Sequence, residues 1–200
     1  MSFVSAEHDR MLAGLVIPCR VVGVDLVAAK VRVSDGGTWV SAWVRWHALA
    51  AGKARHWRSP SMGEQGALVS PSGDPAQGTF IPGLYGNAGA QPDNRDHVEV
   101  WRFDDGGSLV YDWGAKSYTI KVPTGTVNIE VGSSSAVLTD DAINAKSTAI
   151  TAEAQTMTAK ASTITLQGNV QISGQLVVAG NILGGGSIID TTGNTPNHKH

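Results

Sequence analysis

The sequence predicts an all-β protein in two parts, a small barrel followed by a long strand-rich ribbon that must assemble with copies of itself. Its 200 residues include 24 glycines, but only 16% are charged and 6% are aromatic. This composition favours turns and short strands over amphipathic helices. Short alternating apolar segments fill the first half, and a seven-residue repeat rich in threonine and alanine follows in the second.

Residues 1–14 are expected to form the one helix. Ser5 is the candidate N-cap, Phe3 and Leu12 supply a modest apolar face, and Gly14 is expected to end it. The same segment lacks the basic region and apolar run of a secretory signal, so synthesis in the cytoplasm is expected. No stretch approaches the ~20 apolar residues of a membrane-spanning helix.

Residues 15–90 are predicted to form the barrel. The candidate strands are short and separated by turns, and they cover residues 21–24, 30–34, 38–44, 66–70 and 78–83. Five or six strands within about 75 residues are typical of a small closed barrel. Cys19 is the only cysteine, so the chain has no internal disulfide, and its thiol is predicted to be buried and structural.

Residues 91–97 are predicted to be a linker, and residues 98–183 a second strand-rich region. Its alternating segments are separated by turns at intervals of about nine residues, and they cover residues 98–103, 108–113, 118–122 and 126–131. The charge also changes here. Residues 1–95 hold nine basic and seven acidic side chains, whereas residues 96–200 hold six and ten. Neither half has the basic excess of a general nucleic-acid binder.

The repeat over residues 143–166 can be tested as a coiled coil. Its first position is apolar in each copy, with Ile143, Ile150, Met157 and Ile164. A coiled coil needs a second apolar position three residues later, but that position holds Lys146, Glu153 and Lys160. Six threonines between residues 148 and 165 also disfavour a helix. The repeat therefore favours an extended chain.

In an extended chain, alternate side chains of this region share a face. Ile150, Ala152 and Ala154 fall on one side, whereas Thr151 and Glu153 fall on the other. These apolar side chains are too small to form a core within one chain. They would fit at a narrow axis on which several chains meet. A long ribbon that cannot bury itself must bury itself against its own copies. The sequence therefore predicts an obligate oligomer.

Residues 184–200 end in His198-Lys199-His200. Histidines two apart on an extended backbone project to the same side, and imidazole binds iron, zinc, copper and nickel. One chain offers two such ligands, whereas three chains meeting on an axis would offer six, which favours an octahedral iron ion over tetrahedral zinc. The alternatives are a frayed polar tail or the remnant of a purification tag.

The order of these parts resembles that of the phage baseplate assembly protein V family, the contractile-tail spikes of Mu-like phages. The resemblance covers nearly the whole chain. It rests on a short N-terminal helix, a barrel ending near Gly83-Leu84-Tyr85-Gly86, a turn at residues 104–108, the Thr/Ala-rich repeat, and the terminal His-x-His. No single motif is specific, but the ordered set is.

The resemblance implies an oligonucleotide/oligosaccharide-binding (OB) barrel followed by an intertwined trimeric β-helix with a metal-capped apex. It implies one iron ion per trimer, held by His198 and His200 of each chain, and Glu130 and Asp190 are weak candidates for holding further ions on the axis. It implies a homotrimer at the tip of the virion tail baseplate, in contact with hub and tail tube proteins. On sheath contraction this spike would pierce the bacterial outer membrane mechanically, in either a phage or a headless bacteriocin.

Two other classes of function have support from single features of the sequence. An OB-type barrel could bind nucleic acid through a basic run and nearby aromatic side chains, which are Arg45, Lys53, Arg55, Arg58, Trp39, Trp43, Trp46 and Trp57. We expect no nucleic acid, because alternating tryptophans are typical of a barrel core or subunit contact. We also expect no enzyme. The adjacent carboxylates at residues 104–105 and 140–141 lie in predicted turns and point apart in a strand, and His97 is their one candidate partner.

Overall fold

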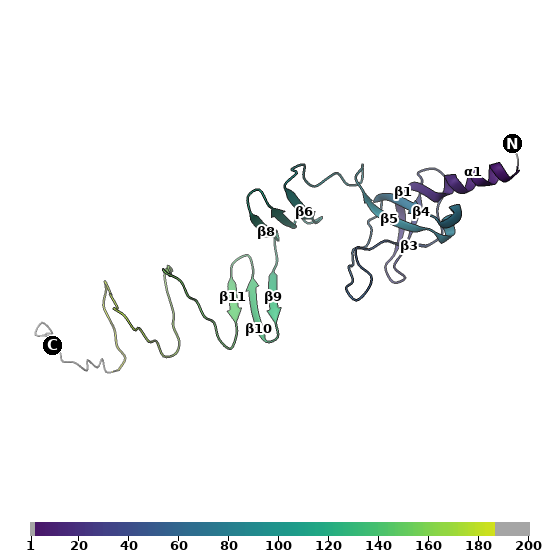
Figure 1. The fold of residues 1–200 in the computed structure, drawn as a ribbon. Helices are drawn as coiled ribbons and strands as arrows, with labels where there is room; N and C mark the ends of the chain where they lie inside the picture. The colour runs from purple at the N-terminus through teal and green to yellow at the C-terminus, as the bar shows by residue number, and fades with distance from the viewer. Residues whose placement is uncertain (1–2, 187–200) are drawn as a thin grey trace, which may run out of the picture. The chain divides into compact units, whose positions relative to one another are not determined.

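A computed structural model describes residues 3–186. The first part is a closed five-stranded barrel with strand order β1-β2-β3-β5-β4 (Figure 1). Its strands are β1 (Val16–Asp25), β2 (Lys30–Ser34), β3 (Val44–Trp46), β4 (Gln65–Val69) and β5 (Thr79–Leu84). Neighbouring strands are antiparallel except β3 and β5, which are parallel. The predicted barrel is therefore confirmed in its architecture, with strands that run from residue 16 to residue 84.

Alternation along the strands fills the barrel with apolar side chains. In β2, Val31 and Val33 are fully buried, and Phe80 of β5 is as well. The complete core consists of Cys19, Val21, Val31, Val33, Val44, Leu68 and Phe80. The predicted burial of Cys19 is confirmed, and this burial raises the pKa of its thiol to about 11. The thiol is therefore protonated and inert at neutral pH.

One predicted strand is largely absent. Residues 38–44 were expected to be extended throughout, but the structure has a single bridge at Val40 and then β3. Ser41 explains the difference. Its buried hydroxyl accepts the Val33 N–H at 3.0 Å and donates to the Ala42 carbonyl at 2.7 Å. A side chain here takes the place of a ladder hydrogen bond, so the segment is fixed without pairing as a strand.

The N-terminal helix α1 (Phe3–Leu15) also differs from expectation at both ends. Ser5 lies inside it and is not its N-cap, and the helix continues through Gly14. Glycine at position 14 instead permits close packing on the short 3₁₀ turn η1 (Pro71–Gly73), because a Cβ there would lie 2.5 Å from the Gly73 carbonyl oxygen. A second such turn, η2 (Pro75–Gln77), leads into β5. No helix within residues 3–186 is long and apolar enough to cross a membrane.

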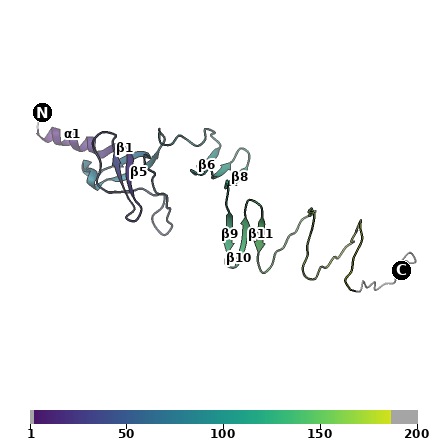
Figure 2. The ribbon, with the colours of Figure 1, turned by 180° about the vertical axis from the view of Figure 1, so that it is seen from behind.

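Two antiparallel three-stranded sheets follow residues 85–97 (Figures 1 and 2). The first has the order β6-β7-β8, with β6 (Val98–Arg102), β7 (Ser108–Asp112) and β8 (Ser117–Lys121). The second has the order β11-β10-β9, with β9 (Val127–Val131), β10 (Ser134–Leu138) and β11 (Ile143–Lys146). Each strand is joined to the next in sequence by a short connection, so both sheets are simple meanders.

Residues 149–186 belong to a second unit. Over residues 147–186 the chain forms neither helix nor strand. The predicted strands of this region are therefore not formed within one chain. A strand needs a neighbour that accepts and donates its backbone hydrogen bonds, and among the residues that the structure describes no segment supplies one here.

Candidate functional site

The β6-β7-β8 sheet has one strongly apolar face. Its register sets Trp101 opposite Leu109, which in turn lies opposite Ile120, and directly opposed residues share a face. The same face holds Trp101, Leu109, Tyr111, Trp113, Tyr118 and Ile120, which we call the aromatic face. The ring of Tyr111 lies 6.3 Å from that of Tyr118 and 6.5 Å from that of Trp113.

This aromatic face is open in the single chain. Trp101 is 43% exposed and Tyr118 is 61% exposed. A groove of about 310 Å³ lies on the face, lined by Glu99, Trp101, Leu109, Tyr111 and Tyr118. The opposite face is mixed, with small apolar residues such as Val100 and Val110 beside Thr119 and Lys121. The sheet therefore presents its largest apolar side chains to solvent.

The β9-β10-β11 sheet repeats this division with smaller side chains. One face carries Val127, Ile129, Val131, Ala136, Leu138, Ile143 and Ala145, and we call it the aliphatic face. The other face carries Asn128, Glu130, Ser135, Val137, Asn144 and Lys146. Ile129 is 57% exposed and Ile143 is 81% exposed. This sheet too leaves its apolar side open.

The unit beyond these sheets exposes apolar side chains at intervals. More than half of the surface of each of Ile150, Met157 and Ile164 is exposed, although they mark the start of successive repeats. Later positions of the same kind are Val170, Ile172, Leu176, Val178 and Ile182. None of these residues belongs to the barrel core, so the chain has more apolar surface than it can cover alone.

Exposed apolar surface of this extent indicates an assembly interface. Covering a side chain such as Ile or Phe contributes about 1.5–3 kcal/mol relative to leaving it in water. A small sheet with one uncovered apolar face is marginal by itself, and its edge strands are open to pairing with other chains. These sheets can therefore bind a partner whose surface is apolar and rich in strands. Another copy of the same chain has such a surface.

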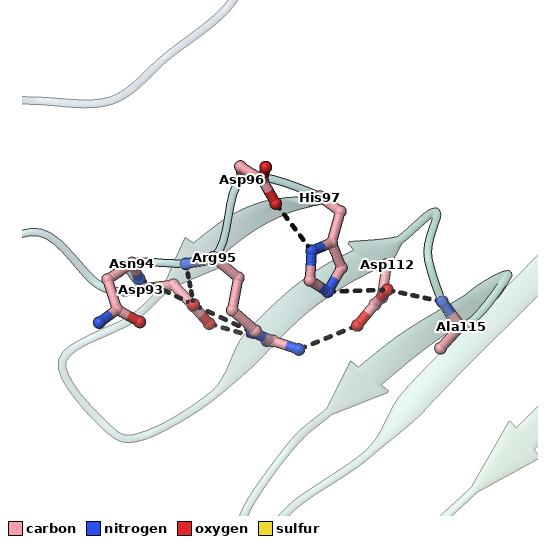
Figure 3. A network of polar contacts seen from close by, with 7 residues as sticks. All are labelled: Asp93, Asn94, Arg95, Asp96, His97, Asp112 and Ala115. Carbon is pink, nitrogen blue, oxygen red and sulfur yellow. Dashed lines mark hydrogen bonds and ion pairs between the residues drawn. The ribbon is translucent and has the colours of Figure 1, made fainter.

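A polar network fixes the start of the first sheet (Figure 3). Arg95 binds Asp93 through two hydrogen bonds of 2.8 and 3.1 Å, and its other terminal nitrogen binds Asp112 at the end of β7 at 2.9 Å. Asp112 also accepts the Ala115 N–H at 2.8 Å. His97 contributes a hydrogen bond to Asp96 and lies 3.9 Å from Asp112. The network ties the predicted linker, residues 91–97, to the turn between β7 and β8.

The charges of this network stabilise its ionised form. The Ala115 N–H, with the charges of His97 and Arg95, holds the pKa of Asp112 below its usual value. Hydrogen bonds from Arg95 hold the pKa of Asp93 well below its usual range. The Asp112 side chain is only 12% exposed, so loss of its charge would remove the one carboxylate that joins Arg95 to the β7–β8 turn while Asp93 stays bound to Arg95. Sequence reasoning missed this network, because 17 residues separate Arg95 from Asp112 and no motif links them.

The candidate metal ligands His198 and His200 lie outside the described residues, as does Asp190. Glu130 lies on the polar face of its sheet, opposite Ser135. Within residues 3–186, no group of three His, Cys, Asp or Glu side chains is arranged to hold a metal ion. The iron site and the axial ions therefore stay predictions.

The candidate nucleic-acid residues differ in their surroundings. Trp39 and Trp46 pack against the barrel core, and the ring of Trp46 lies 5.4 Å from that of Trp57. Arg58 is engaged by Glu64 through two hydrogen bonds of 2.6 and 2.9 Å. Trp43 and Trp57 are exposed, so these two rings of the set stay open to other molecules.

The adjacent carboxylates lie in turns, as predicted. Asp105 accepts the Gly107 N–H between β6 and β7, and Asp141 accepts a hydrogen bond from Thr139 between β10 and β11. The side chain of His97 contacts Asp96 and Asp112 instead of either pair. These carboxylates therefore shape turns.

Comparison with known proteins gives matches to both parts of the chain. Residues 17–85 match a family model described as the type VI secretion system/phage-baseplate injector OB domain. Residues 99–184 match a family model described as the Gp138 beta-helical trimerization domain. The spike protein of Escherichia phage P2 is 30% identical over 115 residues. That match covers 57% of this chain and 54% of the P2 protein, so the chain matches about half the length of this relative.

Two neighbouring residues of β8 test the aromatic face. Ile120→Asp puts a carboxylate on that face, and we expect the oligomer to dissociate at micromolar concentration. Each chain loses the roughly 2 kcal/mol of association free energy that burial of the Ile120 side chain would contribute. The new carboxylate must also be removed from water when the interface forms. Thr119→Asp makes the same change on the opposite face and serves as the matched control. Light scattering measures the mass, and an oligomer retained by Ile120→Asp but lost in Thr119→Asp would place the interface on the other face.

The Asp112 network gives a pH prediction. Because the folded-state pKa of Asp112 lies below its unfolded value, the ionised carboxyl stabilises the fold above about pH 4 and stops doing so as the pH falls through the folded pKa. Asp112→Asn should therefore melt at a lower temperature than the wild type at pH 7, and the difference should shrink toward zero in acid. Thermal melting followed by circular dichroism measures this, with Asp104→Asn in the exposed turn as control. A difference that stays constant from pH 7 to pH 3 would contradict the assigned role.

Proposed function

We propose that this chain pierces the bacterial outer membrane when a contractile sheath drives it forward. The proposal is supported by the match of residues 17–85 to the phage-baseplate injector OB domain model and of residues 99–184 to the Gp138 beta-helical trimerization model. The chain is a baseplate spike protein of structural type. The families matched are structural phage baseplate proteins, and the similarity to the P2 spike protein supports a place in the tail baseplate.

The observation that supports this proposal best is the run of open apolar faces after the barrel. All of these surfaces lie within residues 99–184, the stretch that matches a trimerization domain. They are the aromatic face, the aliphatic face and the exposed apolar residues between residues 150 and 182. Three copies would bury these faces against one another and supply the neighbours that residues 147–186 lack in one chain. Backbone groups paired across chains leave few free edges and produce a stiff rod.

Stiffness is the property that a puncturing device needs. The force of a contracting sheath is transmitted only if the spike neither bends nor frays, and a shared core with interchain hydrogen bonds resists both. The barrel at residues 16–84 would seat the trimer on hub and tail tube proteins, leaving the ribbon to point toward the envelope. The same polypeptide would serve a phage or a headless bacteriocin particle.

The proposed apex ends in His198 and His200. Imidazole nitrogens are suitable ligands for iron, and three chains would supply six of them. When bound, the ion would cross-link three chain ends that would otherwise fray. The role of these histidines is thus mechanical, since they would hold the tip closed.

Removal of the apex tests piercing. Particles whose spike lacks residues 184–200 should assemble and contract on cells, yet they should permeabilise the outer membrane far less than wild-type particles, because a frayed tip spreads the force. Uptake of a hydrophobic dye measures permeabilisation, and electron microscopy scores contraction. Particles with the Lys199→Ala spike provide a control that keeps the full length. Equal dye uptake by truncated and full-length particles at equal contraction would contradict a piercing role for the tip.

Metal content tests the apex directly. The purified protein should have three times the mass of the 20.8 kDa chain and contain one iron per three chains. The His198→Ala/His200→Ala variant should stay a soluble trimer and lose the iron. Elemental analysis and light scattering on the same sample measure both quantities. Full retention of iron by the double variant would refute the ligand assignment.

A further inference from the structure

The barrel carries a cationic face on its outer surface that the assembly faces do not use. In β2 the side chains alternate, so Val31 and Val33 fill the core while Lys30 and Arg32 point outward. Arg45 of β3 is likewise exposed, between the buried Val44 and the half-buried Trp46. We call Lys30, Arg32, Arg45 and the exposed Trp43 the cationic barrel face.

Two of these cations lie directly opposite each other. Lys30 and Arg45 are cross-strand partners in the antiparallel β2–β3 pair, an arrangement that costs stability when both side chains are charged. Within residues 3–186, neither they nor Arg32 form an ion pair. By contrast, Arg58 of the same barrel is neutralised by Glu64. A fold that needed only stability would not place like charges here.

Two acidic side chains flank this face, and both accept backbone hydrogen bonds. Asp25 of β1 lies opposite Lys30, but its carboxylate accepts the N–H groups of Val27 and Ala28 at 3.0 and 2.9 Å. It thus shapes the β1–β2 turn, and its Oδ1 atom is directed at the backbone. Asp35, at the end of β2, accepts the Gly37 N–H in the same way. The cationic barrel face keeps its net positive charge.

Both guanidinium groups are held in place from one side. Arg32 donates its Nε–H to the Ser41 carbonyl at 3.1 Å, and its Cζ atom lies 5.9 Å from the centre of the Trp43 ring. Gly23 makes room for this stack, because a Cβ there would approach the Trp43 ring to 3.3 Å. Arg45 donates its Nε–H to the Thr79 hydroxyl at 3.2 Å. The Nη groups of both arginines form no hydrogen bond to the described part of the chain.

An orientated guanidinium with free Nη groups suits one kind of ligand. Its planar fork matches a carboxylate in two parallel hydrogen bonds, and arginine beside tryptophan is typical of the residues that dominate protein interfaces. We propose that the cationic barrel face docks on an acidic protein surface of the baseplate, with Arg32 and Arg45 binding Asp or Glu side chains. This inference rests on the proposed function. It specifies that the baseplate surface on which the barrel sits is acidic.

The aromatic side chains favour a protein over a nucleic acid as the occupant. Single strands bind where successive bases stack on open aromatic rings. On this face Trp39 and Trp46 are packed against the core, so the face offers a single open ring, Trp43, and not a series of them. Three cations would also contact few phosphates, whereas non-specific nucleic-acid affinity is supplied by many such contacts.

A charge-matched pair of variants tests the proposal on the full-length trimer. The probe is fluorescein-labelled poly-L-glutamate at low salt. We expect wild-type binding that weakens as salt rises, and a roughly tenfold loss in Arg32→Glu/Arg45→Glu, as for removal of interfacial charge pairs. Lys53→Glu/Arg55→Glu changes the net charge equally in a separate loop and should bind within about twofold of the wild type. Arg32→Lys/Arg45→Lys keeps the charge without the fork and should fall between the two.

Other outcomes would overturn the proposal. Equal losses in both glutamate variants would mean that binding follows net charge alone. Tighter binding of labelled oligothymidylate than of poly-L-glutamate, lost in Arg32→Glu/Arg45→Glu, would make this a nucleic-acid face. If Arg32→Glu/Arg45→Glu changed the mass of the protein in light scattering, the cationic barrel face would be a contact between copies of the chain. If that variant had an altered circular dichroism spectrum, Arg32→Lys/Arg45→Lys would replace it in the comparison. Unchanged affinity of the lysine variant for poly-L-glutamate would then contradict bidentate binding by the arginines.

Incorporation into particles separates this proposal from the piercing proposal. Tails assembled with Arg32→Glu/Arg45→Glu should lack the spike in immunoblots, although the free variant keeps the wild-type mass and metal content. Tails with Lys53→Glu/Arg55→Glu should carry the spike at the wild-type level. Normal incorporation of the first variant would refute the docking face and leave piercing untouched, whereas failure of wild-type tails to permeabilise cells would refute piercing and leave docking untouched.

Discussion

The organisation of this protein depends on apolar surface that one chain cannot cover. After the barrel, both three-stranded sheets have a polar or mixed face and an apolar face, and the apolar faces are open. Within residues 3–186, neither sheet is hydrogen-bonded to a further strand, and the one α-helix packs on the barrel side of the chain, against η1. Because burial of apolar area is the main force that holds sheets together, the folded state of this region is inseparable from assembly. The match of residues 99–184 to a model described as a trimerization domain supports copies of the chain as the missing layer.

The barrel obeys the opposite rule. Its five strands close on themselves, so no edge is free and Val31, Val33 and Phe80 fill the interior. Closure lets the outer face carry charge at little risk of aggregation, and this is where Lys30, Arg32 and Arg45 lie. The two parts of the chain therefore differ in how they are stabilised. The barrel buries its own core and presents polar side chains outside, whereas the sheets after it need a partner surface to cover their apolar faces.

Much of this could be predicted from local patterns, because both modules follow two-residue alternation. The barrel follows from this alternation, the burial of Cys19 from the apolar run before it, and the turns at Asp105 and Asp141 from their turn-forming residues. The helix end at Leu15 and the short β3 could not be predicted, because Gly14 and Ser41 act through partners distant in sequence, Gly73 and Val33. The same holds for the Arg95–Asp112 pair and for the stack of Arg32 on Trp43. Sequence alternation identifies which side chains share a face, but cross-strand register decides which of them meet.

Register also reveals a trend in side-chain size along the assembly surface. The first sheet offers Trp101, Tyr111 and Tyr118 on its apolar face, and the second offers valine, isoleucine and leucine. The repeat that follows alternates single large residues such as Ile150 with alanine and threonine. In the proposed trimer, a close-packed core built from these side chains would be narrower at the second sheet than at the first. A narrower cross-section would suit the proposed piercing role, because the same force would then act on a smaller area.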